Sequence, residues 1–370
     1  MDRTRRFLRN VFCLFVATFI ASSTFAQAPS TTLLALSKDD HTVAIVDPST
    51  LQVLARIPSG PDPHEIIASD DGKLAFISNY GGLDSSLNTI SIVDLVARKA
   101  LPPIDLGALR STHGLDFAGG KLYFTAETNK IIGRYDPATQ HVDWILGTGQ
   151  DRTHMVLVSK SLDRIFTSNV NSATISIIEL VSQPNGGFGP PPGGPPGSGP
   201  GGPPPQAQGP PPGGPRKTWE VTNVPAGHGV EGFDVSPDGK ELWAANARDA
   251  TVTIIDIAAK KAVQTIPIAV KGANRLKFTP DGSHVLISGL GARGGDTSLV
   301  VLDVATRKEV KQLSLGGGSA GILIAPDGSR AYVAVSSADK IAVIDLKTLE
   351  VVGQINAGKQ PDGMAWAVKK

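Results

Sequence analysis

The sequence predicts an all-β fold, a seven-bladed β-propeller built from four-stranded blades. Seven segments share an alternating apolar pattern that ends in an acidic residue: 42–47, 89–94, 131–136, 174–179, 251–256, 298–303 and 340–345. The terminal acids lie 47, 42, 43, 77, 47 and 42 residues apart. Removing roughly 35 residues of Pro-rich sequence from the interval of 77 leaves about 42, the repeat length typical of propeller blades. Strict alternation marks each segment as a half-buried strand.

Tight turns containing glycine separate the strands within each unit. Pro-Asp-Gly occurs at 237–239, 280–282 and 326–328, and Asp-Asp-Gly occurs at 70–72. Glycine supplies the positive φ that such hairpin turns require. Four short strands joined by these turns form one blade. The alternative is an open β-solenoid. It is disfavoured because a solenoid needs a regular short turn at every corner of its coils, and the sequence lacks these.

The two ends of the chain predict how the ring closes. Residues 31–36 read as a second strand that has no first strand before it, and residues 363–368 read as a first strand with nothing after it. Pairing these two strands would complete one shared blade. We therefore expect residues 29–370 to form a single domain.

Residues 1–28 have the pattern of a cleaved secretory signal peptide. Arginines within residues 1–10 precede an apolar run over 11–21, and Ala26-Gln27-Ala28 resembles a cleavage site. The single cysteine, Cys13, would leave with this peptide, which suits an oxidising compartment. These features predict a periplasmic or secreted protein, exported by the Sec route, with the twin-arginine route as the alternative. No transmembrane span is expected after signal removal.

The composition divides into an ordinary β-rich chain and one unusual stretch. Fourteen of the 28 prolines and 12 of the 41 glycines lie between residues 184 and 215. We expect residues 182–217 to be a disordered Pro/Gly-rich insertion within blade 4, because so few apolar side chains cannot drive folding. It would be a tolerated insertion or, alternatively, a tether. A net charge of +1 gives no basic field, so nucleic-acid binding is not expected.

The repeat motifs resemble those of the YVTN (YncE-like) β-propeller family. The resemblance lies in residues 230–246, which include Val-Ser-Pro-Asp-Gly-Lys-Glu-Leu-Trp-Ala-Ala-Asn, in 251–256 and in 326–333. It implies a seven-bladed propeller across nearly the whole mature chain. The family includes lactonase-type enzymes, surface-layer proteins, haem-binding propellers and electron-transfer subunits, so the resemblance implies a fold more strongly than a function.

Alignment of the seven units predicts a ring of side chains at the start of the innermost strands. The ring consists of His64, His113, His154, Glu231, Asn274, Ala320 and Asp362, and His228 precedes Glu231 by three residues. Because neighbouring inner strands converge on the axis, the three ring histidines can reach a common point. Imidazoles are ligands for zinc, copper and iron. The sequence thus predicts a divalent metal or anion site, and the alternative is a ring of polar residues that holds only water.

Further polar residues are expected on the face of the propeller where the innermost strands start, which we call the rim. Asn79, Glu127, Asn169 and Asn246 follow the second strands of four blades, and Tyr80 and Arg248 adjoin two of these loops. Turn geometry explains most of the asparagines, whereas Glu127 departs from the pattern. Arg110 and Arg152 precede two ring histidines and could hold an anion, or they could be solvated loop charges.

Two functions fit these residues. The first is a monomeric binding module whose site holds a metal together with a small-molecule ligand or an envelope protein. The second is a metal-assisted lactonase-like hydrolase or lyase that uses His64, His113, His154 and His228 as metal-site residues and Glu231 or Glu127 as base or fourth ligand. No phosphate-binding glycine loop and no Cys-x-x-Cys-His motif occurs, so neither a nucleotide nor covalent haem is expected.

Overall fold

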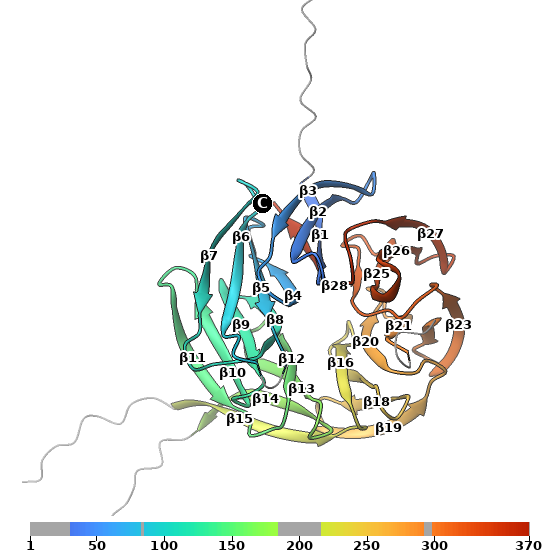
Figure 1. Cartoon of the computed structure of the whole chain (residues 1–370). Coiled ribbons are helices and arrows are strands. Elements are labelled where there is room, and N and C mark those ends of the chain that lie inside the picture. Colours follow the sequence, from blue (N-terminus) through green and yellow to red (C-terminus); the bar gives the residue numbers. More distant parts are fainter. Residues whose placement is uncertain (1–29, 83–84, 184–215, 292–297, 370) are drawn as a thin grey trace, which may run out of the picture.

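The computed structural model describes residues 30–82, 85–183, 216–291 and 298–369. These residues form seven four-stranded antiparallel sheets arranged as a ring, which confirms the predicted seven-bladed propeller (Figure 1). The described part of the chain contains a single three-residue 3-10 helix, η2 (Ser336–Ala338), and no helix there is long and apolar enough to cross a membrane. The predicted signal peptide over 1–28 lies outside the described residues.

The innermost strands surround the ring axis, and each contacts the inner strands of neighbouring blades. They are β4 (Pro63–Ala68), β8 (Thr112–Ala118), β12 (Thr153–Val158), β16 (Val230–Val235), β20 (Ala273–Phe278), β24 (Ile322–Ile324) and β28 (Pro361–Val368). The second strands are β5 (Leu74–Asn79), β9 (Lys121–Ala126), β13 (Arg164–Asn169), β17 (Glu241–Asn246), β21 (His284–Gly289), β25 (Arg330–Val335) and β1 (Thr31–Ser37).

The third strands are the seven repeat segments from which the fold was predicted. They are β6 (Thr89–Asp94), β10 (Ile131–Asp136), β14 (Thr174–Gln183), β18 (Thr251–Asp256), β22 (Ser298–Asp303), β26 (Lys340–Asp345) and β2 (Thr42–Asp47). The outer strands are β7 (Lys99–Asp105), β11 (His141–Gly147), β15 (Arg216–Pro225), β19 (Lys261–Pro267), β23 (Lys308–Ser314), β27 (Glu350–Ile355) and β3 (Gln52–Pro58).

The ring closes through the chain ends, as predicted. Strand β28 is the inner strand of the sheet that continues with β1, β2 and β3. It pairs antiparallel with β1 in a register that places Leu33 opposite Trp366. Backbone hydrogen bonds therefore join the last strand of the chain to the first. This pairing completes the four-stranded blade and closes the ring.

The core lies mainly between the blades rather than within one sheet. Trp243 of β17 is fully buried and packs edge-on against Phe278 of the next blade, with ring centroids 5.6 Å apart. Burying a side chain of this kind contributes roughly 1.5–3 kcal/mol or more. Alternation along each strand supplies two buried faces, one for each neighbouring blade, and this packing holds the inner strands at their positions around the axis.

The margins of the predicted Pro/Gly-rich insertion differ from the expectation. Strands β14 and β15 stay paired as far as Gln183 and Arg216, so the outermost residues of the 182–217 range belong to a β-ladder. Alternating apolar side chains no longer mark this part of the ladder, which is why the sequence did not reveal it. Residues 184–215 lie outside the described residues. The end of β14 and the start of β15 lie on the face opposite the starts of the inner strands, because strands alternate in direction.

Hydrogen bonds to acidic side chains stabilise the turns between the strands of a blade. Asp281 accepts hydrogen bonds from the Thr279 hydroxyl (2.6 Å) and the Ser283 backbone N–H (3.0 Å). Gly282, which follows it, has a φ of 69°, the conformation predicted for these turns. The hydrogen bonds from Thr279 and Ser283 lower the pKa of Asp281 to about 2.

Replacing Asp281 with alanine is expected to lower the free energy of unfolding by about 1 kcal/mol at pH 7, the usual value for such hydrogen bonds. The folded-state pKa is below the unfolded value of about 3.9, so this stabilisation is present above pH ~4 and is lost as the pH falls towards ~2. Urea unfolding from pH 7 down to pH 3 checks it. A difference from the wild type that stays constant through the acid range contradicts the explanation.

Candidate functional site

Two predicted ring histidines lie against each other on adjacent blades. His113 of β8 and His154 of β12 have ring centroids 3.7 Å apart, and each is only 2% exposed. A hydroxyl fixes this arrangement: Thr125 of β9 accepts a hydrogen bond from the Gly114 N–H (2.9 Å) and donates one to the His154 carbonyl (2.7 Å). The side chain of one blade thus holds the backbone of the next, and the two imidazoles are brought together by backbone contacts.

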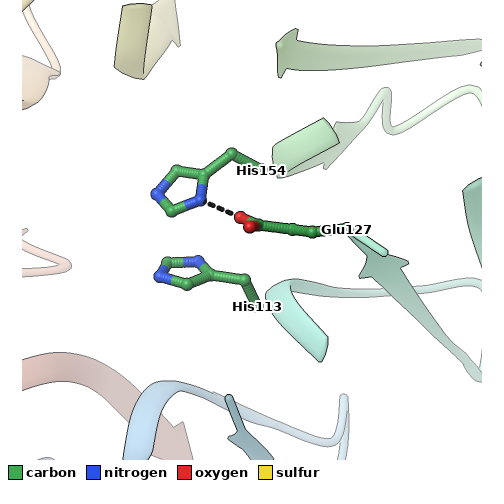
Figure 2. A group of neighbouring side chains, drawn as sticks. All are labelled: His113, Glu127 and His154. Atoms are coloured by element: carbon green, nitrogen blue, oxygen red, sulfur yellow. Dashed lines mark hydrogen bonds and ion pairs between the residues drawn. The ribbon is translucent and has the colours of Figure 1, made fainter. Parts of the chain in front are cut away.

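Glu127, which follows β9 directly, completes the group (Figure 2). One of its carboxylate oxygens is hydrogen-bonded to Nδ1 of His154, and the other accepts a hydrogen bond from the Tyr80 hydroxyl (2.8 Å). The residue is 1% exposed. Ligand atoms of His113, Glu127 and His154 all lie within 4.8 Å of one another. We call these three residues the HHE group.

The protonation state of His113 suits a metal ligand. Burial, reinforced by the neighbouring His154 and His64, lowers the pKa of His113 well below its usual range, so the ring is neutral at pH 7. Its Nδ1 atom is buried and has no hydrogen-bond partner. An unpaired buried polar atom costs free energy, and coordination of an ion would recover it. Two imidazole nitrogens and one carboxylate oxygen are a donor set for zinc, copper or iron rather than for magnesium or calcium.

His64 lies beside the HHE group, but its ring nitrogens have other neighbours. Its ring centroid is 5.1 Å from that of His113. Nε2 is 3.1 Å from Oδ1 of Asp62, and Nδ1 is 3.7 Å from a carboxylate oxygen of Asp362. The hydrogen bond with His64 is the main cause that lowers the pKa of Asp62 to about 2. The group of potential ligand atoms within 4.8 Å of one another thus contains two of the three ring histidines together with Glu127.

His228 is not part of the group. Its side chain is 76% exposed and pairs with Asp249, 3.2 Å from Nδ1. The sequence placed His228 near the axis because it precedes Glu231 by three residues, but the residue lies in the loop before β16 with its side chain exposed to solvent. Tyr80, in contrast, is buried at the site, with its ring 4.8 Å from His64 and 4.9 Å from His113.

The three rim asparagines have structural partners inside their own blades. Asn79 donates to Thr89 (2.8 Å), Asn169 donates to Ser176 (2.9 Å), and Asn246 donates to Thr253 (2.9 Å). Each amide ties the end of a second strand to the third strand, so its side chain is committed to the blade. Turn geometry, the explanation favoured by the sequence, accounts for them. The rim arginines Arg110 and Arg248 are exposed.

Arg152 and Glu231 extend the site along the axis. Arg152 Nε lies 3.4 Å from a Glu127 oxygen, and its Nη1 lies 3.6 Å from a Glu231 oxygen. Burial alone would lower the pKa of Arg152, but the charges of Glu127 and Glu231 outweigh it and raise the pKa. Glu231 also accepts a hydrogen bond from Asn274, another predicted ring residue. Ala320 is buried and has no polar side chain to contribute.

A charged pair that the sequence did not reveal crosses the axis. Arg275 of β20 is hydrogen-bonded to Glu65 of β4, although their blades are not neighbours in the ring. Each follows a ring residue directly, at a position where four other blades have glycine: Gly114, Gly232, Gly321 and Gly363. Two large charged residues interrupting a glycine pattern were the available signal. Lys38, 3.7 Å from Asp362, and Asp62 were missed as well.

Comparison with solved structures supports the fold. A protein of unknown function from Desulfotomaculum acetoxidans aligns with a TM-score of 0.66 and 12% identity over 92% of this chain and 99% of its own. Hydrazine synthase of Kuenenia stuttgartiensis aligns with a TM-score of 0.61 and 16% identity over 82% and 89%. A candidate 6-phosphogluconolactonase of Bacteroides uniformis aligns with a TM-score of 0.63 and 12% identity over 91% and 100%. At these identities the similarity concerns the fold alone.

No curated protein matches the sequence of this chain. The family comparison gives a narrower result than the structures, because residues 268–370 match the YNCE-like β-propeller family. This segment spans the last blades and the strand that closes the ring. This match confirms the predicted resemblance over residues 268–370, and the arrangement of the blades shows that the chain is a seven-bladed β-propeller.

Proposed function

We propose that this protein is a periplasmic or secreted binding propeller that holds a divalent transition metal ion at the HHE group. The ion would be presented to a small-molecule ligand or an envelope protein at the face where the inner strands start. The export pattern of residues 1–28 supports the location, and the N-terminal residue of the exported chain tests it.

The unpaired Nδ1 of His113 is the observation that carries this proposal. It is buried beside a second imidazole and a carboxylate, all with ligand atoms within 4.8 Å. Bonds of about 2.0–2.1 Å to a tetrahedral ion require ligand separations of roughly 3.4 Å, so small side-chain rotations would suffice. Tyr80 would hold the Glu127 carboxylate in place through its hydrogen bond, as outer partners of metal ligands generally do.

Removing either histidine is expected to abolish stoichiometric metal binding. The full chain, purified without a histidine tag, should bind about one equivalent of zinc, copper or iron, and His113→Ala and His154→Ala should each weaken binding by more than the roughly 10–100-fold typical of losing an outer partner. Elemental analysis and calorimetric titration measure this, and circular dichroism verifies folding.

His228→Ala is the matched control, because this exposed histidine is paired with Asp249, away from the HHE group, and its loss should leave metal binding unchanged. Two results contradict the proposal: a wild-type chain that takes up none of the three metals, or a His228→Ala variant that loses binding as severely as His113→Ala.

Metal-assisted hydrolysis of a small cyclic or anionic substrate is the second candidate. A bound divalent ion would polarise a carbonyl or activate water. With Glu127 serving as a ligand, Glu231 is the carboxylate left to act as a base: its side chain is 17% exposed and lies on the other side of Arg152. A structural neighbour described as a candidate 6-phosphogluconolactonase adds support at the level of fold only.

A further inference from the structure

We infer that the metal-loaded site takes a small carboxylate, which bridges the ion and the guanidinium of Arg152. This inference rests on the proposed metal site and names the class of ligand that the site would hold. It rests on three observations: the long distances between Arg152 and its acidic neighbours, the charges around Arg152, and the burial of the HHE group.

Arg152 is held by charge rather than by well-formed hydrogen bonds. Its Nε atom is buried and has no hydrogen-bond partner, and the nearest carboxylate oxygens, on Glu127 and Glu231, are 3.4 and 3.6 Å from its nitrogens. These separations exceed the 2.7–2.9 Å or so that is usual for a charge-assisted bond. A guanidinium has five N–H donors, and among the described residues the Tyr80 hydroxyl is the other hydrogen-bonding neighbour of Arg152, so donors remain for a further acceptor. Its side chain is 22% exposed, so solvent and small solutes reach it.

Metal binding would reverse the local charge. Without an ion, one cation, Arg152, faces two carboxylates, Glu127 and Glu231, which leaves one negative charge. A divalent ion adds two positive charges, which leaves one positive charge. Glu127 would then be engaged by the ion, so Arg152 would lose one of its two acidic neighbours. An anion is therefore repelled from the empty site and attracted to the loaded site.

Two other cations near the axis are paired with carboxylates. Arg275 is hydrogen-bonded to Glu65, and Lys38 lies 3.7 Å from Asp362. Asp62 is engaged by His64 and by the backbone N–H of Gly81. Solvent screens the charge of Asp62, whose side chain is 38% exposed, so the imbalance around Arg152 is left largely uncompensated.

The geometry restricts the anion to a small one. The HHE residues are 1–2% exposed, so a bulky ligand could not reach the ion without moving neighbouring side chains. A planar carboxylate can give one oxygen to an open metal position and accept a charge-assisted hydrogen bond from an N–H of Arg152 with the other. Because binding of each partner then favours the other, ion and anion should bind cooperatively.

The test uses the full chain loaded with cobalt(II), whose visible spectrum reports its coordination, and acetate as the probe. Acetate should change the spectrum saturably in the wild type. Arg152→Gln should raise the acetate dissociation constant about 10–100-fold, as expected for loss of a charge-assisted hydrogen bond, without weakening cobalt binding. Arg152→Lys should lie between the two. Arg248→Gln, at an exposed arginine on the same rim, should behave as the wild type.

The outcomes separate the two proposals. Equal acetate affinity in the wild type and Arg152→Gln overturns the anion inference while leaving the metal site intact, and so does cobalt binding with no response to acetate. If calorimetry shows that acetate binds to the metal-free chain as strongly as to the cobalt-loaded chain, the anion inference is also overturned. Failure of the wild type to bind cobalt or any other tested metal overturns the metal site and the anion inference together.

Discussion

Arg275→Met is expected to lower the free energy of unfolding by about 3–5 kcal/mol, the usual cost of removing one partner from a buried ion pair. Arg275 is 7% exposed, and the side chain of Glu65 is 14% exposed. Burial opposes the charge on Arg275, but Glu65 and the other nearby carboxylates outweigh it and raise the pKa of Arg275. Removing the guanidinium would leave the Glu65 carboxylate near the axis without its partner.

Urea unfolding of Arg275→Met and of the double variant Arg275→Met/Glu65→Leu measures this effect. The double variant removes both charges and should recover much of the lost stability, because two apolar side chains can replace a buried pair at little cost. A double variant no more stable than Arg275→Met would show that the loss arises elsewhere, for example from the hydrogen bonds of Arg275 to Asn274 (3.0 and 3.2 Å).

Gly114→Ala is expected to damage both the fold and the proposed metal site. A Cβ atom built on Gly114 would lie 2.4 Å from the His154 carbonyl oxygen and 2.7 Å from the Met155 Cα. These are backbone atoms that cannot rotate away, so β8 would have to move from β12. Overpacking of this kind costs roughly 1–3 kcal/mol. Since β8 contains His113 and β12 contains His154, the same shift should weaken metal binding by about tenfold, as a binding group tolerates displacements of only about 0.5 Å.

Thermal unfolding and calorimetric metal titration measure the two effects of Gly114→Ala. The matched control is Gly147→Ala at the end of the outer strand β11, where a new Cβ would have nothing within 4 Å. The control should be close to neutral in both measurements. An intact metal affinity in a destabilised Gly114→Ala protein would mean that the contact between β8 and β12 does not position the histidines.

Most of the fold could be predicted because it depends on local sequence that recurs. Each third strand contains a six-residue segment that ends in an acid, and every repeat carries the same information, although β14 continues beyond its acid to Gln183. Blade number and the shared closing blade follow from counting these repeats. The extension of β14 and β15 to Gln183 and Arg216 did not follow, because ladder hydrogen bonds do not require an apolar pattern.

The candidate site was only partly predictable. Alignment placed His113 and His154 on adjacent inner strands, and the departure of Glu127 from an asparagine pattern singled it out. Alignment could not show that His64 turns to Asp62 and Asp362, because this depends on carboxylates from other parts of the chain.

The sequence by itself determined the ring of blades and which residues lie at its axis. The repeat period assigns each residue to a strand of its blade and to a position along that strand. Only the tertiary structure decided which side chains meet. His113, Glu127 and His154 converge because Thr125 links β8 to β12, whereas Arg275 reaches Glu65 because their blades face each other across the axis. The physical reason is that a side chain's partner is set by distances through space, to which residues far apart in the chain contribute.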